Sequence, residues 1–177
     1  MKFSSEKRSD QVLAMALIIL GTLFRVVPHA DNVTPTTAIA LFSGVTLPPA
    51  LALTVPILVM MASDLVLGLH SLFWLVWATF AAVVGIGLWV RKDARAARIT
   101  GGTLSGSILF FVVTNLGVFF FENMYPKTWP GLVQCFTMAV PFFRNSLIGD
   151  VLYSFVFFAL FAAAQWSHHL FQSSKNF

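Results

Sequence analysis

Long apolar runs separated by short polar stretches extend along the sequence from residue 11 to residue 166. A helix that crosses the hydrocarbon core of a bilayer needs about 20 predominantly apolar residues. We interpret six of the runs as membrane-spanning helices, at 11–25, 35–47, 50–69, 71–90, 103–121 and 146–166. Thr34 and Pro35 start the second of them, because Thr is a good N-cap and Pro suits the first helical turn.

A seventh apolar run, 132–143, contains only 12 residues and ends before Arg144 and Asn145. This length is too short to cross a bilayer as a helix. We therefore predict a short re-entrant or interfacial helix before the last span. The predicted fold class is an all-α integral membrane protein, a six-helix bundle that forms one domain over 1–177.

Composition excludes an ordinary soluble globule. Hydrophobic residues make up 58% of the 177 residues and charged residues only 10%, whereas soluble domains carry about 25% charged residues. Six spans leave no room for a separate soluble module, and no nucleic-acid partner is expected. The single cysteine, Cys135, excludes an internal disulfide and a site of cysteine ligands only.

Basic residues predict the orientation. Membrane proteins concentrate Lys and Arg in cytoplasmic segments, and here basic residues gather in the first ten residues and at 91–98. With six spans these two clusters lie on one side of the membrane. We expect a multi-pass protein of the bacterial inner membrane with both termini in the cytoplasm.

This topology places the remaining polar residues in the outer leaflet or its loops. The first span ends at Arg25 and is followed by His29, Asp31 and Asn32. Two aspartates lie inside predicted spans, Asp64 in the third and Asp150 in the sixth. A membrane-embedded Asp costs at least about 2.5–3.5 kcal/mol and usually faces a cavity or a partner. We expect Arg25 or Arg144 to be the counter-charge of these aspartates. Two interpretations of the polar residues remain open: they line a pocket that is open to the outside above an apolar floor, or they form ion pairs that only hold the helices together.

Motifs of catalysis are missing from the sequence. It contains no G-x-S-x-G, H-E-x-x-H, Walker A or G-x-G-x-x-G pattern. We predict no enzymatic activity, no catalytic residues, no metal site and no cofactor.

Small residues four apart, as in Ala40/Gly44, predict close helix packing, and so do the pairs Ala78/Ala82, Gly102/Gly106 and Ala159/Ala163.

Several longer blocks carry a resemblance that covers roughly residues 20 to 160. They are 32–35 leading to 38–44, then 63–70, 114–117, 125–128 and 141–150. These blocks resemble a bacterial family of small, largely uncharacterised membrane proteins. That family is similar to the S-components, the six-helix substrate-binding subunits of energy-coupling-factor (ECF) vitamin transporters, and to solitary vitamin B12 transporters.

The resemblance implies a six-helix bundle that binds a vitamin-like molecule near its outer face. The candidate substrate-binding residues lie both in the polar set and in the resembling region; they are His29, Asn32, Asp64, His70, Asn115, Arg144 and Asp150. The loops 26–35 and 122–129 are the expected lids.

Two departures limit the comparison. The B12 transporters use a cysteine soon after the Ser-Asp block to ligate cobalt, and 71–90 contains no cysteine. S-components that dock on a shared energising module often carry A-x-x-x-A in the first helix, and here Ile18 follows Ala14 and Leu20 follows Ala16. The sequence thus favours a solitary transporter or a different docking surface.

The function expected from the sequence is capture and inward movement of a small organic solute, vitamin-like or cobalamin-related. Two alternatives stay open: a structural or assembly subunit of a membrane complex, and a membrane enzyme that modifies a bound ligand with Asp64 and His29 or His70 as acid–base groups.

Overall fold

A computed structural model describes residues 2–30 and 32–174, with side-chain environments for 7–30 and 32–167. All the regular elements in this part of the chain are helices and none is a strand, which confirms the predicted all-α class. Its elements are α1 (Lys2–Val26), α2 (Thr36–Thr46), α3 (Pro49–Leu67), α4 (Phe73–Val90), the short 3-10 turn η1 (Arg91–Asp93), α5 (Ala96–Phe121) and α6 (Trp129–Ser174).

Five of the six α-helices are long and apolar enough to cross a membrane, and α2 is the exception. Its 11 residues rise only about 16 Å at 1.5 Å per residue, roughly half of the hydrocarbon thickness. The prediction that 35–47 is one of six full membrane spans is therefore wrong. The reason is burial: every residue of α2 from Thr36 to Gly44 is buried, so protein and not lipid surrounds this helix.

The predicted separate short helix at 132–143 is wrong. That segment and the predicted span 146–166 belong to one helix, α6, whose apolar part runs from Trp129 to Ser167. Polar residues such as Arg144 and Asn145 interrupt an apolar run, but they keep the backbone hydrogen bonds that a helix needs. Pro141 removes only its own N–H donor and the helix continues through it.

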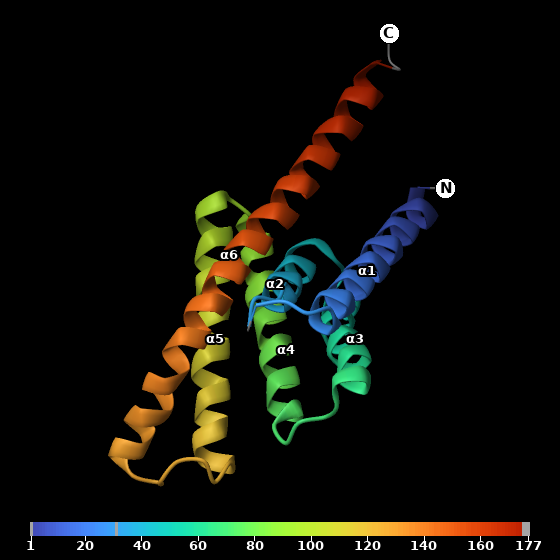
Figure 1. The fold of residues 1–177 in the computed structure, drawn as a ribbon. Helices are drawn as coiled ribbons and strands as arrows, with labels where there is room; N and C mark the ends of the chain where they lie inside the picture. The colour runs from blue at the N-terminus through green and yellow to red at the C-terminus, as the bar shows by residue number, and fades with distance from the viewer. Residues whose placement is uncertain (1, 31, 175–177) are drawn as a thin grey trace.

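The helices form a bundle around α2. Its main neighbour is α4, while α1 packs chiefly on α3, and α5 packs between α4 and α6. Figure 1 shows α2 in the middle of the bundle, with the two chain ends and the α4–α5 junction at one end. The α3–α4 and α5–α6 connections lie at the other end (Figure 1).

Two glycines let α2 and α4 cross closely. A Cβ on Gly44 would meet the Val84 carbonyl oxygen at 2.5 Å, and one on Gly87 would meet the Leu41 carbonyl oxygen at 2.4 Å. These distances are shorter than real Cβ contacts, so the crossing requires glycine at both positions. The apolar core of the bundle is packed around this crossing and includes Ile39, Leu41, Val83 and Val84.

The C-terminal end of α2 is capped by a side chain from the α4–η1 junction. Arg91 Nε donates to the carbonyl oxygens of Gly44 and Val45, both at 3.0 Å. Its Nη2 donates to the carbonyl oxygen of Leu47. The last carbonyls of a helix have no partner inside that helix, so Arg91 supplies the donors for this partly buried helix end.

The small-residue pairs behave in two ways. Gly44 lies at the α4 crossing, and Gly102 and Gly106 face Val90 and Val83, which confirms close packing there. The pairs Ala78/Ala82 and Ala159/Ala163 are exposed on the outside of the bundle. For these two pairs the predicted close packing is wrong, because the spacing alone does not say which side of a helix faces a neighbour.

Candidate functional site

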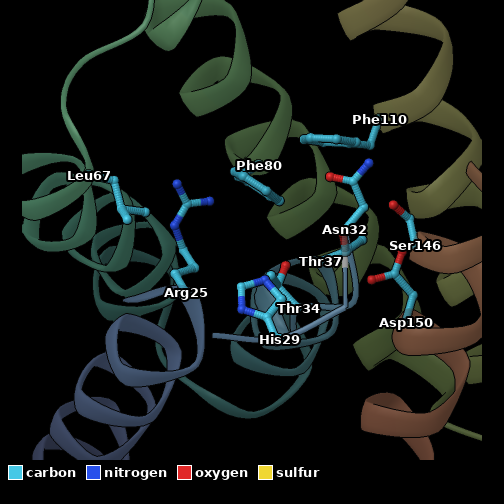
Figure 2. Close-up of a pocket in the computed structure, with 10 residues that line it drawn as sticks. All are labelled: Arg25, His29, Asn32, Thr34, Thr37, Leu67, Phe80, Phe110, Ser146 and Asp150. Atoms are coloured by element: carbon cyan, nitrogen blue, oxygen red, sulfur yellow. The ribbon is translucent and has the colours of Figure 1, made fainter. Parts of the chain in front are cut away.

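Polar side chains of the interior gather at the N-terminal end of α2. They surround a cavity of about 250 Å³, called here the inner cavity. It is lined by Arg25, His29, Asn32, Thr34, Thr37, Leu67, Phe80, Phe110, Ser146 and Asp150. In Figure 2 Arg25 lies on one side of this space and Ser146 and Asp150 lie on the other, with His29, Thr34 and Asn32 between them.

Two further hollows adjoin the inner cavity. A side cavity of about 280 Å³ between α5 and α6 shares Asn32, Phe110 and Ser146 with it. An open vestibule of about 590 Å³ shares Arg25, His29 and Asn32 with it. Asn32 lines all three, so the hollows adjoin one another around this one side chain.

The backbone at Asn32 explains how the α1–α2 loop turns into the cavity. Asn32 has φ +61°, in the left-handed region, which Asn tolerates better than most residues. Val33 N–H donates to the Ala30 carbonyl oxygen at 3.0 Å and closes the turn. The chain then enters α2, which begins one residue after Pro35. The predicted restart of a helix here is confirmed, but the N-cap role expected of Thr34 is wrong, because Pro35 takes the N-cap position and no side chain caps the helix.

Asp150 forms the acidic side of the inner cavity. It comes from α6 and is only 2% exposed. Ser107 of α5 donates its hydroxyl to Asp150 Oδ2 at 2.7 Å, and Thr37 of α2 also hydrogen-bonds the Asp150 side chain. No ion pair of Asp150 exists within the described residues.

Asp64 has a different environment. Arg25 Nη2 donates to Asp64 Oδ1 at 2.9 Å, and Trp77 Nε1 donates to Oδ2 at 3.0 Å. Arg25 Nε also donates to the hydroxyl of Ser63 at 2.7 Å. The predicted pairing of Arg25 with an intramembrane aspartate is thus confirmed. Both Asp64 oxygens are engaged by protein donors, and Asp64 does not line any of the three hollows.

The other candidate residues divide into two groups. His29 lines the inner cavity and vestibule, and its Nδ1 donates to the Val27 carbonyl oxygen at 2.7 Å. Asn115 lines the side cavity, where its Nδ2 donates to the Phe111 carbonyl oxygen at 2.7 Å. His70 and Arg144 are exposed and line none of the three hollows.

Four of the seven predicted site residues therefore line the joined hollows: His29, Asn32, Asn115 and Asp150. Asp31, which the sequence puts in the same loop, lies outside the described residues. The first expected lid, 26–35, provides five of the seven residues of the vestibule wall, whereas the second, 122–129, provides none.

Sequence reasoning did not nominate Thr34, Thr37, Ser107 or Ser146 as site residues. Hydroxyl residues are common in membrane helices, where they bond back to a carbonyl of their own helix, as Ser107 does to Thr103. Their position in the walls of the inner and side cavities distinguishes them from other hydroxyl residues of the helices. A single sequence carries no signal for that position.

Part of the wall of the inner cavity is aromatic and apolar. Phe80 of α4 and Phe110 of α5 stack with centroids 5.0 Å apart and planes at 30°, and both line the inner cavity. Beyond Thr37 the residues of α2 are fully packed, with Ile39, Ala40 and Leu41 at 0% exposure. The inner cavity is therefore closed toward the α2–α4 crossing.

The described residues hold no group of three His, Cys, Asp or Glu side chains that could bind a metal ion. Cys135 is buried, and its Sγ lies 3.5 Å from the Asn115 carbonyl oxygen.

An all-helical, membrane-embedded bundle with an interior polar cavity is the class of protein that these features define. The chain belongs to a family of unknown function, DUF6580, whose family profile matches residues 5–173. No curated protein and no solved structure matches the chain.

Proposed function

We propose that this protein is a membrane-embedded solute-binding protein that captures a small organic solute in the inner cavity and moves it across the membrane. The observation that carries the proposal is the continuity of three hollows around Asn32. Charged and polar groups in lipid are costly, and a bundle that only needs to be stable gains nothing from lining a cavity with them.

The size of the inner cavity favours a small ligand. Sites for small molecules commonly measure about 300–1,000 Å³, and the inner and side cavities measure about 250 and 280 Å³. A solute of vitamin size suits this space better than one as large as cobalamin. The cobalt-ligating cysteine of the B12 transporters has no counterpart in 71–90, which points the same way.

The direction of capture follows from the basic residues. Lys7 and Arg8 are at the start of α1, and Arg91, Lys92, Arg95 and Arg98 are at the α4–α5 junction, at the end of the bundle that carries both termini (Figure 1). Lys and Arg concentrate on the cytoplasmic side of bacterial inner-membrane proteins. In this orientation the vestibule, at the far end of α1, opens to the outside.

Movement of the solute would require the α1–α2 loop to close over the vestibule and the bundle to tilt or open below. The resemblance to ECF S-components and to solitary vitamin transporters is consistent with such a mechanism. Because the first helix lacks the A-x-x-x-A pattern, we favour a solitary transporter over a subunit of a shared energising module.

The test is recovery of a bound solute from the purified protein. Ser146→Phe places a ring at the wall shared by the inner and side cavities, whereas Ser167→Phe adds the same ring on an exposed position of the same helix. We expect native mass spectrometry to detect a small organic molecule bound to the wild type and to S167F and not to S146F. Recovery of no solute from the wild type, or equal recovery from S146F, would contradict the proposal.

A second candidate is a structural subunit of a membrane complex, and the Arg25–Asp64–Trp77 contact favours it. That contact joins α1, α3 and α4, and of its three residues Arg25 lines the inner cavity whereas Asp64 and Trp77 do not. If locking helices is the only task of the interior charges, neutralising Asp150 should also impair folding or assembly. A binding protein should instead lose its solute while it remains folded.

The membrane-enzyme alternative required Asp64 as an acid–base group with His29 or His70. Asp64 is held by Arg25 and Trp77 through both oxygens, and it lines none of the three hollows in which a ligand could bind. We therefore do not favour this candidate.

A further inference from the structure

We propose that the captured solute carries a cationic nitrogen group, which Asp150 receives, on a flat apolar body that packs against Phe80 and Phe110. This inference rests on the proposed function and adds the chemical class of the solute.

The first argument is the balance of charge around the inner cavity. Arg25 is the only fully ionised cation in its described wall, and its charge is already opposed by Asp64 at 2.9 Å. The pair is neutral as a unit. Asp150 faces the same cavity, and its partners among the described residues are hydroxyl groups. Asp150 is therefore a carboxyl group of the described wall without a counter-charge, and a cationic ligand would supply one.

The second argument is the place of Asp150 relative to α2. Thr37, which hydrogen-bonds Asp150, is in the first turn of α2, where the helix dipole puts about half a positive charge. Two hydroxyls and a helix N-terminus support a carboxylate, but they do not cancel a full charge. They also mean that the carboxylate of the protein itself occupies the place where an anionic ligand would bind.

The third argument weighs against Arg25 as the main recognition group for an anion. Its Nε and Nη2 donate to Ser63 and Asp64, so the Nε/Nη2 face of the guanidinium is used inside the protein and its charge is already opposed by a carboxylate. Bidentate recognition of carboxylate or phosphate needs two parallel N–H donors. An anionic solute would also lie in the same small cavity as Asp150.

The fourth argument concerns the rest of the solute. Phe80 and Phe110 stack on each other and line the inner cavity between Arg25 on one side and Ser146 and Asp150 on the other (Figure 2). Aromatic faces attract cations and pack well against flat rings. A protonated amine or a cationic heterocycle attached to a ring thus matches the aromatic wall and the carboxylate together.

The test compares three probes of one shape that differ in charge. Benzylamine is cationic, benzyl alcohol neutral and benzoate anionic at neutral pH. Binding to the purified protein in detergent is measured by thermal unfolding and by equilibrium dialysis. We expect benzylamine to bind about tenfold or more tightly than benzyl alcohol, since a hydrogen bond to a charged group is worth at least that factor, and benzoate not to bind.

Three variants assign the preference to Asp150. Asp150→Asn keeps the shape and an acceptor for Ser107 but removes the charge, and it should bring benzylamine to within about twofold of benzyl alcohol. Ser107→Ala keeps the charge and should keep the preference for benzylamine. Asp10→Asn makes the same chemical change near the start of α1, far from the cavity, and should behave as the wild type. If D150N does not fold, the probe series on the wild type and on S107A decides.

Equal binding of the three probes, tighter binding of benzoate, or an unchanged preference in D150N would overturn the cationic class. Binding of none of them to the wild type would overturn it as well. None of these results would contradict the proposed function. That proposal is tested separately, by the recovery of a solute from the wild type and from the S146F and S167F variants.

Discussion

Arg25 and Asp64 form an ion pair of 2.9 Å that joins the end of α1 to α3, and Trp77 of α4 completes the coordination of the carboxylate. Asp150, the other intramembrane aspartate, has hydroxyl partners and faces a cavity. The two residues look alike in the sequence, yet within the described residues Asp64 has a counter-charge and Asp150 has hydroxyl partners without one.

We predict that Asp64→Asn destabilises the fold strongly. The change leaves the half-buried Arg25 side chain, 18% exposed, without its counter-charge, and the cost of breaking a fully buried pair, about 3–5 kcal/mol, is the upper limit of the loss. Trp77→Phe removes only one neutral donor and should cost about 1 kcal/mol. Unfolding in mixed detergent measures both, and equal stability of D64N and W77F would contradict the difference.

Arg91 is predicted to matter for α2 and not only for orientation. Arg91→Ala removes the donors of the Gly44, Val45 and Leu47 carbonyls, and we expect a loss of more than about 2 kcal/mol because buried carbonyls then stay unsatisfied. The neighbouring exposed residue gives a matched control, Lys92→Ala, which should change stability by less than about 0.5 kcal/mol.

The glycines of the α2–α4 crossing should not tolerate a methyl group. A Cβ at Gly44 or Gly87 would lie within 2.5 Å of a carbonyl oxygen of the other helix, and overpacking of this kind costs about 1–3 kcal/mol or more. Gly85→Ala, on the same helix with nothing within 4 Å, should be neutral or stabilising, because Ala is the better helix former. Thermal unfolding of G44A, G87A and G85A checks the order.

Asn32 should be needed for binding more than for folding. Asn32→Gly permits the positive φ and removes the side chain, so we expect a folded protein with weakened retention of its solute. Asn32→Ala removes the same side chain but must adopt a left-handed backbone, at a cost of about 1 kcal/mol. Stability and solute retention are measured on both variants. Unchanged retention in N32G would show that its amide contributes nothing to the site.

The orientation is testable with single cysteines. In a Cys135→Ala background, His29→Cys should react with a membrane-impermeant maleimide from outside intact cells. Lys92→Cys should react only after the membrane is opened. The opposite pattern would reverse the assigned topology and with it the direction of capture.

Much of the fold is readable from the sequence because the bilayer sets helix length. Four of the predicted spans, 11–25, 50–69, 71–90 and 103–121, coincide with long helices of the bundle, and the cost of an unpaired charge in lipid predicts the pairing of Arg25 with an aspartate. The prediction for α2 was wrong. Its run of 13 apolar or small residues is hardly longer than the 12-residue run at 132–143, so its length already argued against a full span, and the packing against α4 shows that it lies inside the bundle.

The candidate site was predictable in part, for a related reason. Asn32 and Asp150 are polar residues in regions where polarity is costly, so the sequence marks them. His70 and Arg144 are polar as well, but they are exposed at a helix connection and on the outside of α6. Sequence alone does not separate a costly polar residue from one that reaches water or headgroups.

The shortness of α2 also constrains how the chain is assembled during synthesis. The carbonyl groups at the C-terminal end of α2 are hydrogen-bonded by Arg91, and the side of α2 at Gly44 packs on Gly87. Both of these residues are synthesised more than forty residues after the end of α2. Until then this segment has neither the length to stay in the lipid by itself nor the partners that satisfy its end. The nascent N-terminal third should therefore remain incompletely inserted and open to protease until α4 arrives, which makes the first four helices one unit of biogenesis.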